Sequence, residues 1–150
     1  MRGKFFEGAT PTTLWRAQSR QDFKKQVFLM EPHPGYVKKD KATGEVIKER
    51  LPDVMIVERD GKKIVKGCRC TSGNYRGISV FDVMVTWLGP SWVNYEIPEG
   101  TVIPENLALT KDHYIPRHKA THYTLAPKDD MTLELFLASL KVVADKAIQK

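Results

Sequence analysis

The sequence predicts an α+β fold, in which several short antiparallel strands share one core with few helices. Three observations support this prediction. Short segments with period-two alternation recur along the chain, the C-terminal segment has the apolar spacing of an amphipathic helix, and strands and helices do not alternate regularly. A chain of 150 residues without an internal repeat is expected to form a single domain, residues 1–150.

Composition and charge narrow the class of protein. The chain is 41% hydrophobic and carries a net charge of +6 at pH 7. No segment approaches the roughly 18 apolar residues of a membrane span, and no apolar run follows the basic start MRGKFFEGAT, so we expect neither an anchor nor a cleaved signal peptide. Export by a route that needs no signal peptide stays open. Cys68 and Cys70 are too close for a mutual disulfide and too few for zinc, so we expect reduced thiols in a cytoplasmic protein and no metal.

The N-terminal half is expected to begin with a strand at Thr12–Gln18, followed by a short helix at Gln21–Met30. The polar, lysine-rich stretch Glu31–Asp53 is interpreted as an irregular excursion. Val54–Gly67 is the clearest hairpin, because the Asp60–Gly61 pair between its two apolar runs suits a tight primed turn.

The C-terminal half is expected to be richer in strands. Residues 68–75 are interpreted as a loop that leads into the strand RGISVFD, and Val83–Leu88 either extends that strand or opens a helix. Further strands are expected at Trp92–Ile97, Leu107–Thr110 and Thr121–Ala126, the last closed by Pro127.

The C-terminal segment DMTLELFLASLKVVADKAIQK predicts an amphipathic helix. Asp129 or Asp130 can cap its start. Its apolar side chains fall on one stripe: Leu133, Leu137, Leu140, Ala144 and Ala147.

Three of the strands carry side chains that suit neither a core face nor a solvated face. Arg16 lies in the middle of TTLWRAQ, and His122 lies opposite the core face of ATHYTLAP. In RGISVFD the odd face consists of Gly77, Ser79 and Phe81. Taken singly, Arg16 is more typical of a surface residue, and Gly77 with Ser79 is more typical of a β-bulge. His122 alone is more typical of a histidine with ordinary hydrogen bonds in the core or at the surface. Together they indicate a candidate site, because half-buried polar groups need partners.

These residue types fit a ligand with a phosphate, a flat ring and hydroxyl groups. Arg16 can bind a phosphate with two parallel hydrogen bonds, Gly77 lets a backbone approach closely, and Phe81 can face a ring. Nicotinamide adenine dinucleotide (NAD) is one such ligand, although spacing alone does not single it out. The usual nucleotide and metal motifs GxGxxG, GxxxxGK[ST] and HExxH are absent from the sequence.

Several segments resemble a known family. TLWRA, GISVFD, YEIPEGTVIPENLALTKD and ATHYTLAP, followed by a C-terminal helix, resemble the Tse-two-like cytotoxins of type VI secretion systems, which have an ADP-ribosyltransferase-like fold. The segments occur in the family's order from about Gly77 onward, whereas Glu31–Thr71 matches poorly.

The resemblance implies two small, roughly perpendicular antiparallel sheets with flanking helices and an NAD cleft between them. It also implies Arg16, Ser79 and His122 as catalytic residues, with Arg16 on the pyrophosphate and Ser79 orienting the ribose. The implied NAD contacts are Arg16, Gly77, Ser79, Phe81, His122 and Tyr123.

Two positions depart from the family's pattern. Ile78 stands where a threonine often precedes the serine. More importantly, His122 stands where most transferases of this fold have a glutamate that stabilises positive charge. A protonated histidine opposes a developing cation, so whether NAD turnover survives without the glutamate is left open.

The favoured function is therefore a bacterial toxin that uses NAD to ADP-ribosylate a cytoplasmic protein or nucleic acid. The resemblance implies a cognate immunity protein or antitoxin, and the +6 charge indicates an acidic one. Alternatives are an NAD-dependent RNA 2′-phosphotransferase, or a non-catalytic RNA-binding toxin that uses the basic segment Lys38–Arg50. The acceptor and the route of delivery, by secretion or from a toxin–antitoxin locus, stay open.

Overall fold

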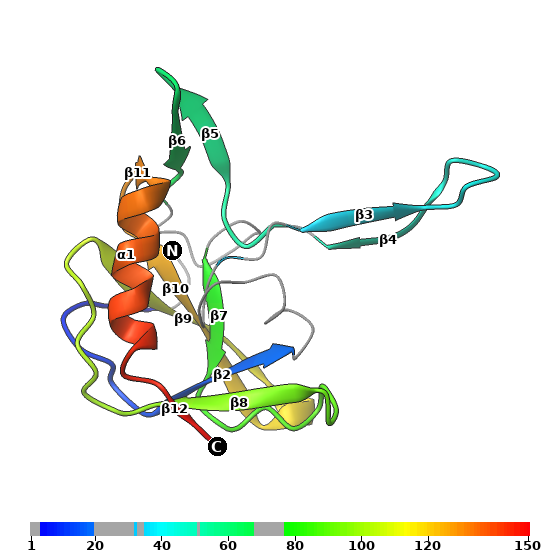
Figure 1. The fold of residues 1–150 in the computed structure, drawn as a ribbon. Helices are drawn as coiled ribbons and strands as arrows, with labels where there is room; N and C mark the ends of the chain where they lie inside the picture. Colours follow the sequence, from blue (N-terminus) through cyan, green and yellow to red (C-terminus); the bar gives the residue numbers. More distant parts are fainter. Residues whose placement is uncertain (1–3, 20–31, 33–34, 51, 68–76) are drawn as a thin grey trace.

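A computed structural model describes residues 4–19, 32, 35–50, 52–67 and 77–150 (Figure 1). The predicted helix Gln21–Met30 and the predicted loop 68–75 lie outside these residues. The described elements are β1 Lys4–Phe6, β2 Leu14–Ser19, β3 Tyr36–Lys39, β4 Val46–Arg50, β5 Ile56–Arg59, β6 Lys62–Val65, β7 Ile78–Phe81, β8 Trp92–Ile97, β9 Leu107–Ile115, the 3-10 turn Pro116–His118, β10 Ala120–Pro127, β11 Met131–Thr132, α1 Leu133–Ala144 and β12 Ile148–Gln149.

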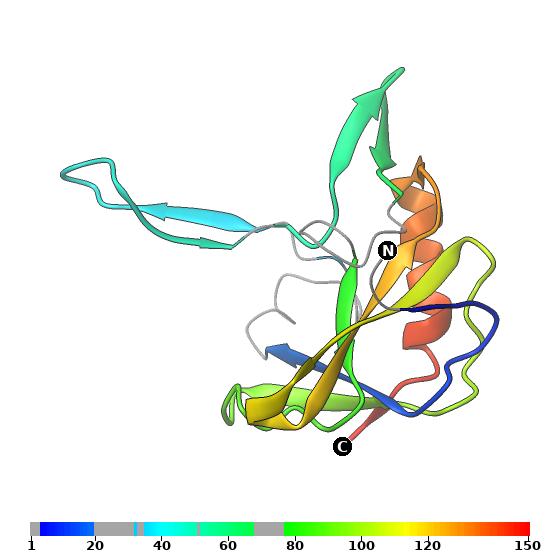
Figure 2. The ribbon, with the colours of Figure 1, turned by 180° about the vertical axis from the view of Figure 1, so that it is seen from behind.

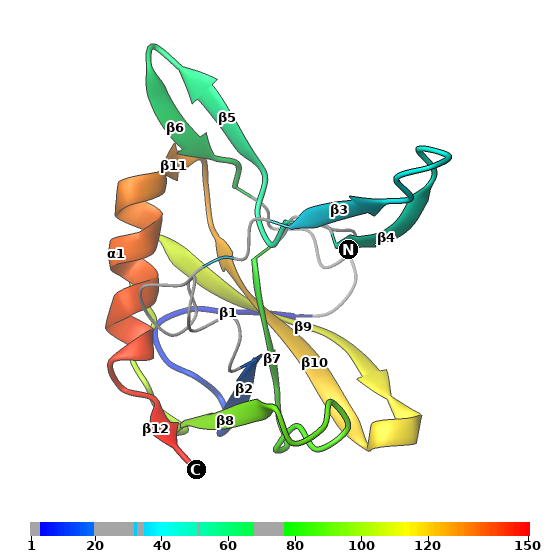
Figure 3. The same ribbon diagram turned by 45° about the vertical axis from the view of Figure 1, so that its right-hand side comes forward.

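The fold is α+β, as predicted, and its strand pairs are antiparallel. The main sheet has the order β1-β9-β10-β7-β2-β8-β12. β7 and β2 are joined through one residue pair, Trp15 with Phe81, whereas β2 pairs with β8 along its whole length. Figures 1 and 3 show β7 running upright while β8 crosses below it. The sheet therefore changes direction at the junction between β7 and β2.

Helix α1 covers the core face of this sheet. Phe136, Leu140 and Val143 are buried on the helix and belong to the same cluster as Val80 and Leu125 of the sheet. Leu140 was predicted to lie on the apolar stripe, but the most buried face is rotated toward Phe136 and Val143. In the described part of the chain, no helix is long and apolar enough to cross a membrane.

The predicted cap of this helix is wrong. The Oγ1 atom of Thr132 accepts a hydrogen bond from the backbone N–H of Leu135, so Thr132 is the N-cap in place of Asp129 or Asp130. The helix begins late because Met131 and Thr132 pair with β6 as the short strand β11. Asp130 instead forms an ion pair with Lys66, which lowers the pKa of its carboxyl.

The hairpin predicted at Val54–Gly67 is confirmed as β5–β6. Asp60 and Gly61 both have positive φ, 52° and 77°, as a primed turn requires.

The interpretation of Glu31–Asp53 as irregular is wrong for residues 36–50. β3 and β4 form a second hairpin that projects from the body (Figure 1). Its turn is closed by Asp40, whose side chain accepts hydrogen bonds from the backbone N–H groups of Ala42 and Thr43. The sequence analysis missed this turn because it interpreted the many charged residues of the stretch as an irregular excursion.

Strands β9 and β10 are the longest pair in the sheet, and Figure 2 shows them lying side by side along the back of the molecule. β9 was predicted to end at Thr110 but continues to Ile115. Val83–Leu88 forms neither a strand nor a helix. The side-chain amide of Asn94 holds it instead, through hydrogen bonds of 2.9 Å to both the N–H and the C=O of Val85.

Gly77 provides a test of the packing between β7 and β10. Its φ is +152°, and a Cβ atom there would clash with the carbonyl oxygen of Leu125. Gly100 has a φ of +83° but open space around it. We predict that Gly77→Ala lowers the free energy of unfolding by about 1–3 kcal/mol more than Gly100→Ala, because only the former forces the backbones apart. Equal losses in chemical denaturation would contradict this packing.

Candidate functional site

The polar face of β7 lies beside the polar face of β10. Ser79 pairs with Thr124 and Phe81 pairs with His122, and directly paired residues share a face of the sheet. The alternate residues of both strands, such as Ile78 and Val80, are buried in the core. The division of RGISVFD and ATHYTLAP into an apolar and a polar face is therefore confirmed.

His122 joins Ser79 to a residue that the sequence analysis did not select. Its Nε2 atom lies 3.0 Å from Ser79 Oγ, and its Nδ1 atom lies 2.7 Å from Asp112 Oδ2. A carboxylate only accepts hydrogen bonds, so Nδ1 is the donor to Asp112. In a neutral imidazole, Nε2 is then the acceptor, and the Ser79 hydroxyl donates to it. We call this hydrogen-bonded chain of Asp112, His122 and Ser79 the relay.

Asp112 lies at a bulge in β9. His122 pairs with His113 and Tyr123 pairs with Lys111, so Asp112 is the extra residue between them. A bulge redirects a side chain relative to the regular alternation of a strand. The Asp112 side chain is 0% exposed, compared with 14% for His122.

Two threonines also bind this carboxylate. Thr110 Oγ1 donates to Asp112 Oδ1 at 2.7 Å, and Thr124 Oγ1 donates to Asp112 Oδ2 at 2.6 Å. Together with His122, these donors compensate the loss of water around a buried charge. The pattern Thr110-x-Asp112 next to THYT could have signalled the site, but the predicted strand ended at Thr110.

Arg16 lies next to the relay. Its Nη1 atom donates a hydrogen bond of 2.9 Å to the backbone carbonyl oxygen of Ser79. Arg16 belongs to β2 and is half-buried. The structure thus brings together Arg16, Ser79 and His122 from three strands.

Gly77 and Tyr123 have other roles in the structure. The close approach that Gly77 permits is to the backbone of β10. Tyr123 is 5% exposed and lies in the core cluster. Burial, with a smaller contribution from the charge of Asp82, raises the pKa of its hydroxyl. Tyr123 therefore belongs to the core rather than to the polar face.

Aromatic rings border the relay. The Phe81 ring makes edge-to-face contacts with His122, at a centroid distance of 5.3 Å, and with Trp87, at 5.2 Å. Trp87 stacks on His118 at 4.1 Å, and His113 stacks on His122 at 5.1 Å. The rings thus pack into one aromatic cluster that includes His122.

Within the described ranges, no group of three His, Cys, Asp or Glu side chains is arranged to hold a metal ion. A groove of about 340 Å³ lies elsewhere, between β6 and the start of α1, and contains none of the predicted site residues. It is lined by Lys62, Lys63, Thr132, Leu133, Glu134 and Leu137.

Comparisons with known proteins bear on this site. A family model described as Tse2 ADP-ribosyltransferase toxin matches residues 8–149. Among curated proteins, toxin Tse2 of Pseudomonas aeruginosa is 33% identical over 101 residues, which cover 67% of this chain and 58% of that toxin. The chain thus aligns with little more than half of the length of this relative.

The threonine donors provide a test of the buried carboxylate. We predict that Thr124→Val lowers the free energy of unfolding by about 1.5–3 kcal/mol, because Asp112 loses one charge-assisted hydrogen bond without a change of side-chain shape. The matched change Thr121→Val, on the opposite face of β10, should cost less than about 0.5 kcal/mol. Equal midpoints of urea-induced unfolding for the two variants would contradict the described role of Thr124.

Proposed function

Because the chain belongs to the family of Tse2 ADP-ribosyltransferase toxins, we propose that it transfers ADP-ribose from NAD to a macromolecule in the cytoplasm of a target cell. The observation that carries this proposal is the convergence of Arg16, Ser79 and His122 from three strands into one hydrogen-bonded group. An arginine, a serine and a histidine that meet from three strands distant in the sequence are more typical of a functional site than of a purely structural contact.

The side chains at this point fit the chemical groups of NAD. The Arg16 guanidinium supplies positive charge for the pyrophosphate, and the ring of Phe81 supplies a flat apolar surface for the nicotinamide. Ser79 supplies a hydroxyl that can hydrogen-bond the ribose. We infer that the cleft for NAD opens where the sheet changes direction between β2 and β7, since Arg16 and Ser79 meet there.

The reaction breaks the bond between the nicotinamide nitrogen and the ribose carbon, and the carbon gains positive charge as that bond lengthens. Nicotinamide leaves with the bonding electron pair, and an acceptor atom then bonds to the ribose carbon. The enzyme gains most by holding the two phosphates and the ribose in place before this step. Arg16 and Ser79 perform that positioning. The positive guanidinium of Arg16 binds the phosphates rather than the ribose carbon, where it would oppose the developing positive charge.

A toxin with this activity needs a neutraliser in the cell that makes it. We propose a cognate immunity protein whose acidic surface complements the net charge of +6. Binding over Arg16 and Ser79 would block access of NAD to the site. The association rate of such a pair falls as salt increases, because the charges steer the encounter.

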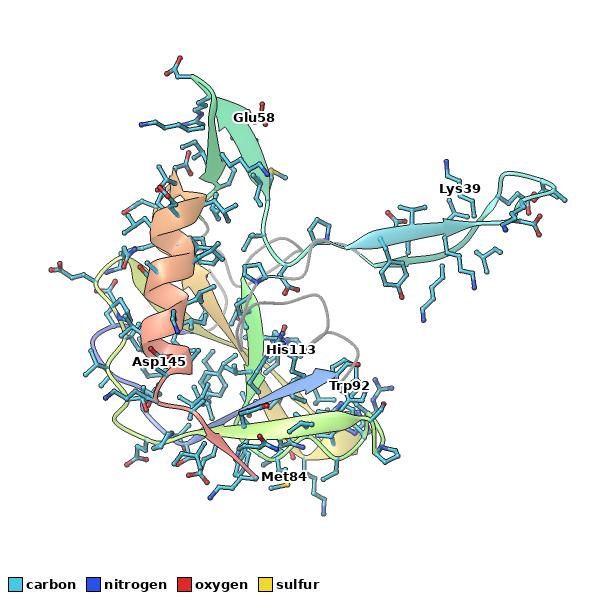
Figure 4. The ribbon with its side chains drawn as sticks, viewed as in Figure 1. Lys39, Glu58, Met84, Trp92, His113 and Asp145 are labelled. Atoms are coloured by element: carbon cyan, nitrogen blue, oxygen red, sulfur yellow. The ribbon has the colours of Figure 1, made fainter. Side chains whose placement is uncertain are left out.

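A second candidate function, nucleic-acid binding, is supported by the β3–β4 hairpin. Lys38 pairs with Lys48, and the Lys48 ammonium lies 5.9 Å from the centre of the Tyr36 ring. The described side chains of β3 and β4 are exposed, and Figure 4 shows Lys39 extending outward from the projecting hairpin. Lysines beside an exposed ring suit a phosphate backbone and a stacked base. Glu49 lies on the other face, opposite Val37.

Arg16 provides the first test of the transferase proposal. We predict that Arg16→Lys lowers the rate of nicotinamide release from NAD by at least about tenfold, because an ammonium cannot replace a two-pronged hydrogen bond donor. Ser79→Ala should lower it similarly while leaving thermal unfolding nearly unchanged. The control is Lys141→Ala on the exposed side of α1. Full activity per folded molecule in both site variants would contradict the proposal.

The hairpin provides the test of the second candidate. If β3–β4 binds RNA, Lys38→Gln with Lys48→Gln should weaken binding of a single-stranded RNA and reduce the salt dependence of the binding constant by about one unit of slope per lysine. The matched control is Lys62→Gln with Lys63→Gln in the β5–β6 hairpin. Equal effects of the two pairs would indicate attraction by overall charge instead.

A further inference from the structure

We propose that Asp112 is the carboxylate of this reaction and that it acts through His122. The inference rests on the proposed transferase function and identifies a residue of the same site. Cleavage of a bond to an anomeric carbon creates a cation-like ribose, and enzymes usually place a carboxylate near such a centre. On the polar face of β7 and β10, the paired positions are occupied by Ser79, Phe81, His122 and Thr124, none of which is acidic.

Asp112 supplies the missing negative charge from beneath His122. Its carboxylate is 0% exposed and receives hydrogen bonds from His122, Thr110 and Thr124. With a neutral imidazole, the pair of Asp112 and His122 has a net charge of −1. Protonation of the imidazole reduces that net charge to zero. The pair therefore resolves the conflict between a histidine and a developing cation, provided that the histidine is neutral.

The relay also extends the negative potential of Asp112 through His122 to Ser79. Asp112 accepts from Nδ1, Nε2 accepts from the Ser79 hydroxyl, and Ser79 Oγ keeps lone pairs that can accept hydrogen bonds. Hydrogen bonds arranged in series polarise one another, so each acceptor becomes more electron-rich than it would be alone. The Ser79 oxygen and the imidazole together present a negative potential to the ribose.

A purely structural role explains the geometry less well. Burial of an isolated carboxylate costs free energy, and well-packed apolar residues of similar volume often stabilise a fold at least as well. Here the chain uses a bulge at Asp112 and two threonine hydroxyls to keep the carboxylate buried, and the same carboxylate fixes the tautomer of His122. Asp112 is thus a positioning residue that acts through His122.

The test compares nicotinamide release from NAD by the full-length wild-type chain, Asp112→Asn, and Asp112→Asn combined with His122→Glu. We expect Asp112→Asn to lower the rate by about 100-fold, in the range found for loss of one charge-stabilising group. The double variant returns a single negative charge to the position of His122, so it should recover at least tenfold over Asp112→Asn. Circular dichroism melting of each variant corrects the rates for the folded fraction.

A second pair of variants keeps the test decisive where Asp112→Asn fails to fold. In His122→Gln the amide can donate to Asp112 and accept from Ser79, so the relay and its charge persist, whereas His122→Leu removes both bonds. We expect His122→Gln to exceed His122→Leu at least tenfold in rate.

The outcomes separate this inference from the proposed function. If the wild-type chain releases nicotinamide and Asp112→Asn is equally active, the role of Asp112 is overturned and the proposed transferase function stands. Equal rates for His122→Gln and His122→Leu would overturn it as well. A wild-type chain that releases no nicotinamide from NAD would overturn the proposed function, and the role of Asp112 with it.

Discussion

The burial of one carboxylate organises the centre of this molecule. The Asp112 side chain lies out of contact with water, so its charge requires hydrogen-bond donors from the protein. The bulge in β9 turns it toward Thr110, Thr124 and His122, and these bonds fix the register of β9 against β10. His122 then holds Ser79 on β7, and the Ser79 carbonyl holds Arg16 on β2. Four strands are thus tied together by one chain of polar contacts that begins at a single buried charge.

The arrangement of the sheet explains why the polar residues lie together on one face of β7 and β10. The opposite faces of β7 and β10 pack under α1 and are filled with aliphatic side chains, which leaves one face for polar residues. The single pair between Trp15 and Phe81 lets β2 and β8 turn away from β7, so the guanidinium of Arg16 reaches the relay from a differently oriented part of the sheet. A continuous flat sheet would keep Arg16 in line with β7.

The sequence allowed the local features to be predicted better than the long-range ones. Alternation separated Ile78 and Val80 from Ser79 and Phe81 correctly, because period two depends only on neighbouring residues. Asp112 was missed because its role depends on a bulge, and a bulge is fixed by pairing with a strand that follows later in the chain. The cap at Thr132 was missed for a similar reason, since pairing of β11 with β6 delays the start of the helix. The resemblance to the toxin family gave Arg16, Ser79 and His122 their expected roles, whereas the contact between Asp112 and His122 needed the structure.

The tautomer of His122 is the most direct measure of the relay. Nitrogen-15 NMR of histidine-labelled protein distinguishes a protonated Nδ1 from a protonated Nε2, and the signals of His122 are identified by their loss in a His122→Gln variant. At neutral pH the relay requires a neutral ring with its proton on Nδ1, because Asp112 accepts there and Ser79 donates to Nε2. A neutral ring with its proton on Nε2, or a ring protonated on both nitrogens at neutral pH, would contradict the relay as the source of negative charge at this site.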